Sequence, residues 1–145
     1  MSTNPSQATK KAPFQTQVRI KFREGDPAQI MYFANIFSLA HDAFEEFIVA
    51  AGYKWEEWFK TDLYMIPIRF TEADFKIPFK PGQEYQIEVS VESFSTSSFV
   101  MKYLFSSPLG LHAQVKMVHS CLDQKTKQKI PVPALMRERL EAYLE

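Results

Sequence analysis

The sequence is poor in the residues that mark several common kinds of functional site. One cysteine, Cys121, stands among 145 residues, so neither an intrachain disulfide nor a two-cysteine zinc motif can form. Four glycines leave no glycine-rich phosphate loop, and no GxSxG or HExxH motif occurs. The histidines His41, His112 and His119 are far apart in the chain, which indicates core or surface positions. We therefore expect no metal site and no cofactor.

Net charge and long apolar runs are absent as well. Seventeen Lys and Arg balance seventeen Asp and Glu, and a neutral chain without a basic cluster is a poor partner for nucleic acid. No apolar run reaches the roughly 18 residues of a membrane span. Residues 1–12 are polar and lack the apolar segment of a secretory signal. We expect a cytoplasmic protein with neither a nucleic-acid nor a membrane partner.

Aromatic side chains are abundant: thirteen Phe, six Tyr and two Trp make up 14% of the chain. With 46% hydrophobic residues, the composition is typical of a globular domain with a large core. The length fits one domain, which we expect over residues 14–145 after a disordered leader over residues 1–13. So many rings in a small domain indicate a thick core, an apolar ligand slot, a subunit interface or some combination of these.

Apolar periodicity predicts one long helix over residues 35–51, ended by Gly52. Its apolar stripe consists of Ile36, Ala40, Phe44, Phe47, Ile48 and Ala51. A short amphipathic helix is expected over residues 134–145, through Leu135, Leu140 and Leu144.

Alternating apolar and polar residues predict strands before and after the long helix. They cover residues 14–22, 83–94, 98–105 and 111–122, and a segment over residues 66–75 whose alternation slips after Phe70 in the manner of a bulge. His119 and Cys121 share the apolar face of one strand, which predicts that both are core residues. Short connections favour antiparallel pairing. The sequence therefore predicts an α+β fold in which an antiparallel sheet curls around one helix.

Asp26 lies at the break between the first strand and the long helix, between Gly25 and Pro27. In one interpretation it is an Asx-turn residue before a proline. In the other it is a carboxylate near the positive end of a helix, where backbone N–H groups polarise a carbonyl oxygen and the carboxylate attacks the carbonyl carbon, directly or through water. The local pattern leaves both open.

The segment GDPAQIMYFANIF, residues 25–37, resembles the signature of the 4-hydroxybenzoyl-CoA thioesterase family, in which an Asp-Pro-Ala-Gly-Ile-Val-like run precedes the long helix. The order of elements agrees over residues 14–140. The resemblance implies the hotdog fold, an antiparallel sheet of five to six strands wrapped around one long central helix. It also implies hydrolysis of acyl-CoA, acyl-carrier or acyl-pantetheine thioesters by a homodimer or homotetramer with active sites between subunits.

The resemblance also assigns roles to individual residues. Asp26 matches the catalytic carboxylate, as nucleophile or general base. Phe33 stands where the family often has Tyr or His, and its backbone N–H would polarise the thioester oxygen. Substrate-binding positions are Pro27 and Ile30 at the turn, Tyr32 beside the slot and Ser98 at the nucleotide portion.

Two departures from the family pattern leave alternatives open. Gln29 replaces the usual Gly, and the hydroxyl run Ser95-Thr96-Ser97-Ser98 replaces a basic pair that grips CoA phosphates. These departures motivate a non-catalytic acyl-ligand-binding or structural hotdog protein as the alternative to a thioesterase. A hotdog dehydratase is a third interpretation, although no histidine stands beside Asp26 in the sequence.

Overall fold

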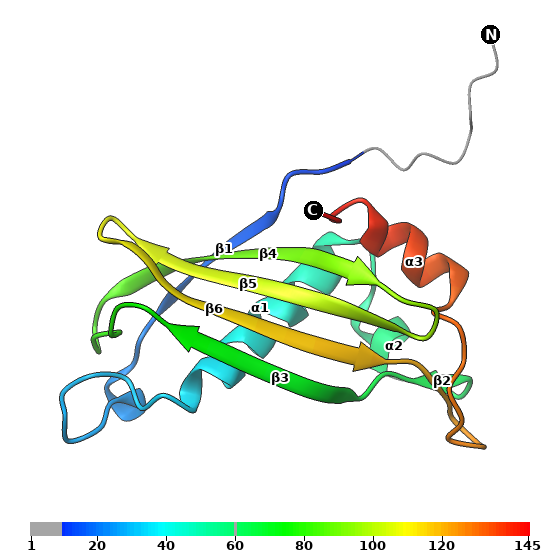
Figure 1. Ribbon diagram of the computed structural model, residues 1–145, viewed down its shortest axis with the longest axis horizontal. Helices are drawn as coiled ribbons and strands as arrows, with labels where there is room; N and C mark the ends of the chain where they lie inside the picture. The colour runs from blue at the N-terminus through cyan, green and yellow to red at the C-terminus, as the bar shows by residue number, and fades with distance from the viewer. Residues whose placement is uncertain (1–9, 60) are drawn as a thin grey trace, which may run out of the picture.

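The computed structural model describes residues 10–59 and 61–145, and its largest feature is a curved antiparallel sheet (Figure 1). Its strands run in the order β1-β4-β5-β6-β3. The bounds are Phe14–Arg19 for β1, Ile68–Phe75 for β3, Glu84–Phe94 for β4, Ser98–Ser107 for β5 and Gly110–Ser120 for β6. Two short strands, β2 (Tyr64–Met65) and β7 (Leu122–Asp123), pair separately. A disordered leader was expected over residues 1–13, and residues 1–9 of it lie outside the described residues.

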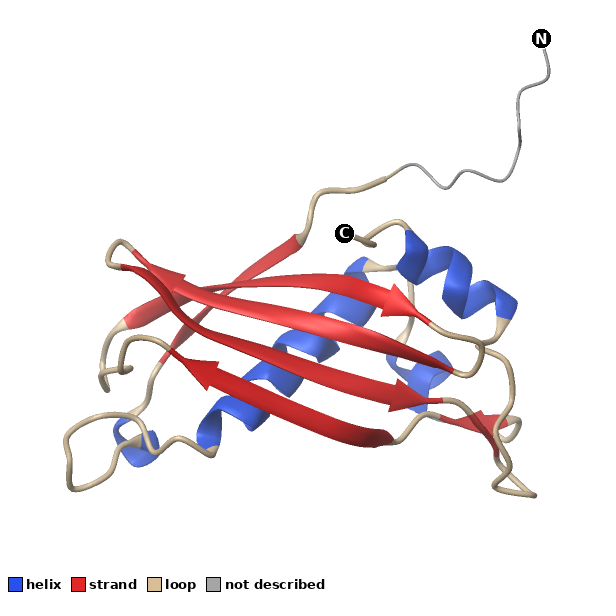
Figure 2. Ribbon diagram, viewed as in Figure 1, coloured by secondary structure: helices blue, strands red, loops and turns tan. Residues whose placement is uncertain are grey.

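The helix α1 (Asn35–Ala50) lies across one face of this sheet, as Figure 2 shows. All six residues of the predicted apolar stripe are buried. The stripe follows the helical repeat, so one side of α1 faces the sheet while Asp42 and Glu46 on the other side stay exposed. The predicted hotdog architecture of one long helix wrapped by an antiparallel sheet is confirmed.

The strands turn alternate side chains toward α1. Ile87, Phe99, Met101, Tyr103 and Phe105 are essentially inaccessible to solvent, and each burial of such a side chain stabilises the fold by about 1.5–3 kcal/mol. Cys121 and His119 are buried as predicted, and burial raises the pKa of the Cys121 thiol to about 11. A thiol with so high a pKa is inert at neutral pH.

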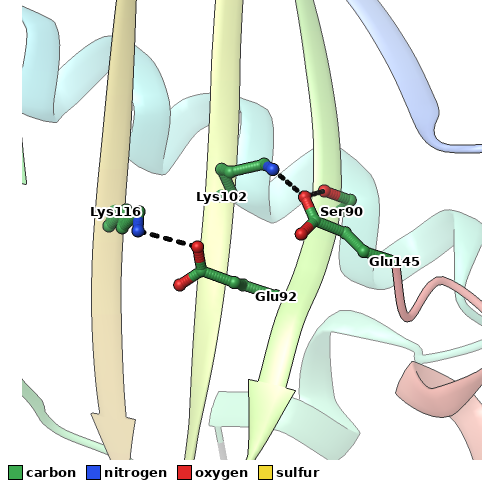
Figure 3. Close-up of polar contacts among 5 residues, drawn as sticks. All are labelled: Ser90, Glu92, Lys102, Lys116 and Glu145. Atoms are coloured by element: carbon green, nitrogen blue, oxygen red, sulfur yellow. Dashed lines mark hydrogen bonds and ion pairs between the residues drawn. The ribbon is translucent and has the colours of Figure 1, made fainter.

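The opposite face of the sheet carries a group of paired polar side chains (Figure 3). Lys116 Nζ lies 2.7 Å from Glu92 Oε1, and the hydrogen bond from this lysine to Glu92 raises its pKa. Lys102 pairs with Glu145, whose carboxylate also accepts a hydrogen bond from the Ser90 hydroxyl. The end of the chain is thereby held to the sheet, and the Glu145 N–H donates to the Val91 carbonyl at 3.0 Å.

Two smaller helices cover the far end of the core. They are α2 (Trp55–Phe59) and α3 (Ala134–Glu141). In α3 the buried side chains are Met136 and Leu140, whereas Leu135 is 52% exposed. The expectation that Leu135 belongs to the apolar face was wrong: Met136 and Leu140 are four residues apart and share the buried face, and Leu135 lies about 100° around the helix from Met136.

The first strand is shorter than predicted. β1 ends at Arg19, and Phe22 begins a 3₁₀ turn, η1 (Phe22–Glu24). The Glu24 side chain accepts the Lys21 N–H at 2.8 Å, which closes this turn and breaks the alternation. Phe22, which the predicted strand over residues 14–22 included, is 95% exposed.

The irregularity expected in the strand over residues 66–75 is present but earlier than predicted. The register of β3 against β6 shifts between Ile68 and Phe70 rather than after Phe70. β3 is an edge strand, and among the described residues its only partner strand is β6.

Candidate active site

The loop between η1 and α1 is a closed turn that holds Asp26. Gly25 and Met31 form an isolated antiparallel bridge at its base. The Asp26 N–H donates to the Ile30 carbonyl at 3.0 Å, and Asp26 Oδ1 accepts the Ala28 N–H at 2.8 Å. Asp26 therefore does form the Asx turn that the local pattern predicted.

The turn occupies one carboxylate oxygen of Asp26 and leaves the other open. Within residues 10–59 and 61–145, Oδ2 has no hydrogen-bond or ion-pair partner. Asp26 is half-buried and lines a pocket of ≈ 580 Å³. The pocket is also lined by Phe22, Gly25, Pro27, Gln29, Lys80, Pro81 and Gln83. The turn interpretation and the functional one are thus compatible, because a fixed carboxylate with one free oxygen faces a pocket.

The same loop is tied to the start of α1. The Glu24 carbonyl accepts the Tyr32 N–H at 2.8 Å and Asn35 Nδ2 at 2.9 Å. Ala34 precedes the helix and offers no side-chain cap. Among the residues that the structure describes, the Phe33 N–H has no acceptor. An unpaired amide at the positive end of a helix of 16 residues is suited to polarise a carbonyl oxygen.

An apolar cavity of ≈ 260 Å³ lies beside Phe33. Phe33 is 59% exposed, and its ring packs edge-on against Tyr32 at 5.0 Å between ring centroids. The cavity is also lined by Ile30, Met31, Phe75, Lys76, Ile77, Pro78 and Phe79. The Met31 N–H donates to the Phe79 carbonyl at 2.8 Å, so the loop before β4 and the Asp26 loop are held together.

The structure therefore gathers five of the six expected site residues at one end of the sheet. Asp26 and Pro27 line one pocket, Ile30 and Phe33 line the other, and Tyr32 contacts Phe33. Ser98 lies at the start of β5, nine residues from its far end, which is roughly 30 Å of extended chain. Its hydroxyl is paired with that of Ser95. Within one chain Ser98 is thus remote from Asp26.

Lys80 and Gln83 are pocket residues that the sequence did not mark as a site. They belong to the loop before β4, which no local motif connects to Asp26. Gly25 permits this approach, because a Cβ at position 25 would lie 2.9 Å from Pro81 Cγ.

Gln29 has a φ of 66°, in the left-handed region where the family usually has Gly. We expect Gln29→Gly to raise the free energy of unfolding by about 1 kcal/mol, because a non-glycine residue in this region is strained by about 1–2 kcal/mol and the added chain entropy offsets part of the relief. Gln29→Ala is the matched control, since alanine retains the strain. Urea unfolding checks this expectation, and equal stabilities for the two variants would contradict it.

Comparison with known proteins agrees with this fold. A family model described as the Thioesterase-like superfamily matches residues 20–140, and the chain belongs to that superfamily. A 1,4-dihydroxy-2-naphthoyl-CoA hydrolase of Synechococcus elongatus is 30% identical over 135 residues, covering 92% of this chain and 96% of that protein. Another from Microcystis aeruginosa is 28% identical, covering 83% and 88%.

A solved structure with the same fold is that of a 1,4-dihydroxy-2-naphthoyl-CoA thioesterase from Synechocystis. It superposes with a TM-score of 0.80 at 19% identity, covering 88% of this chain and 94% of that one. The comparisons confirm a thioesterase-like hotdog protein. They do not single out the 4-hydroxybenzoyl-CoA family suggested by the loop motif.

Two further features of the described residues bear on the site. None of their helices combines the length and apolar character needed to cross a bilayer. Nor does any group of three or more His, Cys, Asp and Glu side chains among them have the arrangement of a metal site.

Proposed function

We propose that the protein hydrolyses acyl-CoA thioesters with Asp26 as its catalytic carboxylate. The observation that carries the proposal is the open Oδ2 of Asp26, which lines a pocket on the loop that leads into α1. Membership of the thioesterase-like superfamily supports the reaction class.

The chemistry needs three groups, and this end of the sheet offers all of them. The Phe33 N–H would donate to the thioester oxygen and stabilise the negative charge that develops there. Asp26 would either attack the carbonyl carbon or remove a proton from the attacking water. The C–S bond then breaks and the CoA thiolate leaves. Where Asp26 is the nucleophile, water then hydrolyses the acyl–Asp26 anhydride, which releases the acid and restores the carboxylate. The cavity beside Phe33 would hold the acyl group.

An aromatic acyl group suits this cavity. Phe33, Phe75 and Phe79 line it, and aromatic side chains pack well against the faces and edges of other rings. The two curated relatives described above are hydrolases of an aryl-CoA, 1,4-dihydroxy-2-naphthoyl-CoA. We propose an aryl-CoA substrate of this kind for the present protein, in preference to the 4-hydroxybenzoyl-CoA suggested by the loop motif.

A turnover assay on a panel of aryl-CoA and aliphatic acyl-CoA thioesters tests this function directly. A thiol-trapping dye reports release of free CoA. We expect turnover, with aryl-CoA esters having the highest kcat/KM. If acyl-CoA binds, as measured by calorimetry, and no thiol is released, the alternative of a non-catalytic acyl-ligand-binding protein is correct.

The working unit is proposed to be a dimer or a tetramer. The edge strand β3 carries the exposed apolar side chains Ile68 and Phe70, and unpaired strand edges favour pairing with a second chain. In an antiparallel dimer the Ser98 end of one subunit can approach the Asp26 end of its partner. This arrangement gives Ser98 a route to the substrate that one chain does not offer.

Light scattering at micromolar concentration is expected to give at least twice the 16.9 kDa of one chain. Charged residues on the β3 edge, in the double variant Ile68→Lys with Phe70→Lys, should shift the protein toward monomer. Leu135→Lys is the control, because Leu135 is also exposed but lies on α3. A monomeric wild-type protein with full turnover would contradict the proposal.

A further inference from the structure

A second pair of reactive side chains lies outside the Asp26 pocket. Ser107 ends β5 and His112 lies in β6, across the turn that connects these strands. Ser107 Oγ and His112 Nε2 are 2.7 Å apart. His112 is almost completely buried, with 1% of its surface exposed. This is the distance at which a serine hydroxyl and a general base cooperate.

The tautomer of His112 follows from its other contacts. Nδ1 lies 3.2 Å from the Pro78 carbonyl and 3.3 Å from the Ile77 carbonyl. Carbonyl oxygens only accept hydrogen bonds, so Nδ1 carries the proton of the neutral ring. Nε2 is then the unprotonated nitrogen and accepts the Ser107 hydroxyl proton. The backbone carbonyls thus orient the ring as the third member of a catalytic triad does.

The Ser107 hydroxyl oxygen has one lone pair that no hydrogen bond occupies. It donates its proton to His112 and accepts the Leu109 N–H at 3.1 Å. A hydroxyl oxygen has two acceptor lone pairs, so one remains for attack on an electrophile. The Leu109 contact also holds the side chain toward His112.

Both residues line a pocket of ≈ 550 Å³ that is distinct from the Asp26 pocket. The two pockets share only Lys80 and Gln83. The Ser107 pocket also adjoins the cavity beside Phe33, with which it shares Ile30, Ile77 and Pro78. The remaining lining residues are mostly apolar or aromatic: Ile30, Ile77, Pro78, Glu84, Tyr85, Pro108 and Leu109. Its size and lining suit a small organic ligand.

Tyr85 supplies a hydrogen-bond donor to this pocket. Its hydroxyl oxygen accepts the Lys80 N–H at 2.8 Å, and among the described residues its own proton has no acceptor. The Tyr85 ring stands edge-on to the His112 ring with centroids 4.7 Å apart. A free phenol proton beside a Ser–His pair can stabilise a carbonyl oxygen that becomes negative.

We propose that Ser107 and His112 form a second acyl-transfer centre, which accepts esters and thioesters of small apolar acyl groups. Ser107 Oγ attacks the acyl carbonyl carbon while its proton moves to His112 Nε2, and the Tyr85 hydroxyl donates to the carbonyl oxygen. The tetrahedral intermediate expels the alcohol or thiol, which takes the proton from His112. An acyl-Ser107 ester remains. Water, deprotonated by His112, then releases the carboxylic acid and restores Ser107.

An alkyl fluorophosphonate with a biotin tag tests the nucleophile without any assumption about the substrate. The serine oxygen displaces fluoride from phosphorus, and mass spectrometry of the labelled wild-type protein identifies the modified residue. We expect the label on Ser107, with a labelling rate at least tenfold lower in His112→Gln. Ser106→Ala is the matched control: Ser106 is the neighbouring hydroxyl in β5 and has no hydrogen bond to His112, so labelling should be unchanged.

The second measurement separates this centre from Asp26. In the Asp26→Asn background, the remaining hydrolysis of p-nitrophenyl butyrate should fall at least tenfold when Ser107→Ala is added, whereas adding Ser106→Ala should leave it unchanged. Wild-type protein that takes up no label on Ser107 overturns the proposal, as does labelling that is equally fast in His112→Gln. In either case the Ser107–His112 contact only connects the β5–β6 turn to the loop before β4. The wild-type result decides this even where a variant fails to fold.

Discussion

Asp26→Asn is expected to lower kcat for thioester hydrolysis by about 10²–10⁴-fold, the contribution of a positioned acid–base group. Asparagine has nearly the same shape, and its Oδ1 can still accept the Ala28 N–H that holds the turn. The variant therefore removes the charge on the open oxygen and leaves the loop in place. Steady-state kinetics with the best thioester of the panel measures the effect.

The control for this experiment is Asp42→Asn. Asp42 is an exposed carboxylate on α1, away from the helix start, and its loss should leave kcat within about twofold, as is usual for surface substitutions. Thermal unfolding should show both variants folded. Wild-type turnover by a folded Asp26→Asn protein would contradict the assignment of Asp26, even if the protein proves to be a thioesterase.

The elements with regular periodicity were predictable from the sequence. The stripe of α1 and the alternation in β4, β5 and β6 repeat over many residues, so burial on one face dominates the local preferences. Element ends were less predictable, because a few local contacts decide them. The exposed position of Phe22 depends on the Lys21–Glu24 contact, and the register of β3 shifts between Ile68 and Phe70 rather than after Phe70.

The candidate site also has a part that the sequence predicts and a part that it does not. The Asp26 turn is local, so Gly25, Asp26 and Pro27 were readable as a motif. The approach of Lys80 and Gln83 to Asp26 depends on contacts between segments more than fifty residues apart, which a single sequence does not record. The orientation of His112 likewise depends on carbonyls of the 77–78 segment, more than thirty residues earlier in the chain.

A different histidine should make the fold sensitive to acid. His119 is 2% exposed and lies between the rings of Phe44 and Phe99, with centroid distances of 4.8 Å and 4.9 Å. Neither of its ring nitrogens has a hydrogen-bond partner among the described residues. Burial, with a smaller contribution from His41, lowers its pKa from 6.5 to about 3, because the charged ring would lose its hydration.

The sign of the pH effect follows from proton binding. Between pH 6.5 and about 3 the unfolded chain binds a proton at position 119 that the native protein does not. The free energy of unfolding therefore falls as the pH falls through this window, by up to about 1.4 kcal/mol per pH unit. The stability is fully present above pH 6.5 and declines toward pH 3.

His119→Leu should remove this part of the pH dependence. Between pH 6.5 and 5 the wild type is expected to lose about 2 kcal/mol more than the variant, measured by urea unfolding at each pH. The quantity compared is the slope of the free energy of unfolding against pH. A change in packing energy caused by leucine is the same at every pH, so it does not alter this slope. His41→Gln is the control, because it removes a half-exposed histidine of α1 and leaves the buried ring. If His119→Leu keeps the wild-type slope, the native His119 ring accepts a proton in this range and its environment is less apolar than the stacked rings indicate.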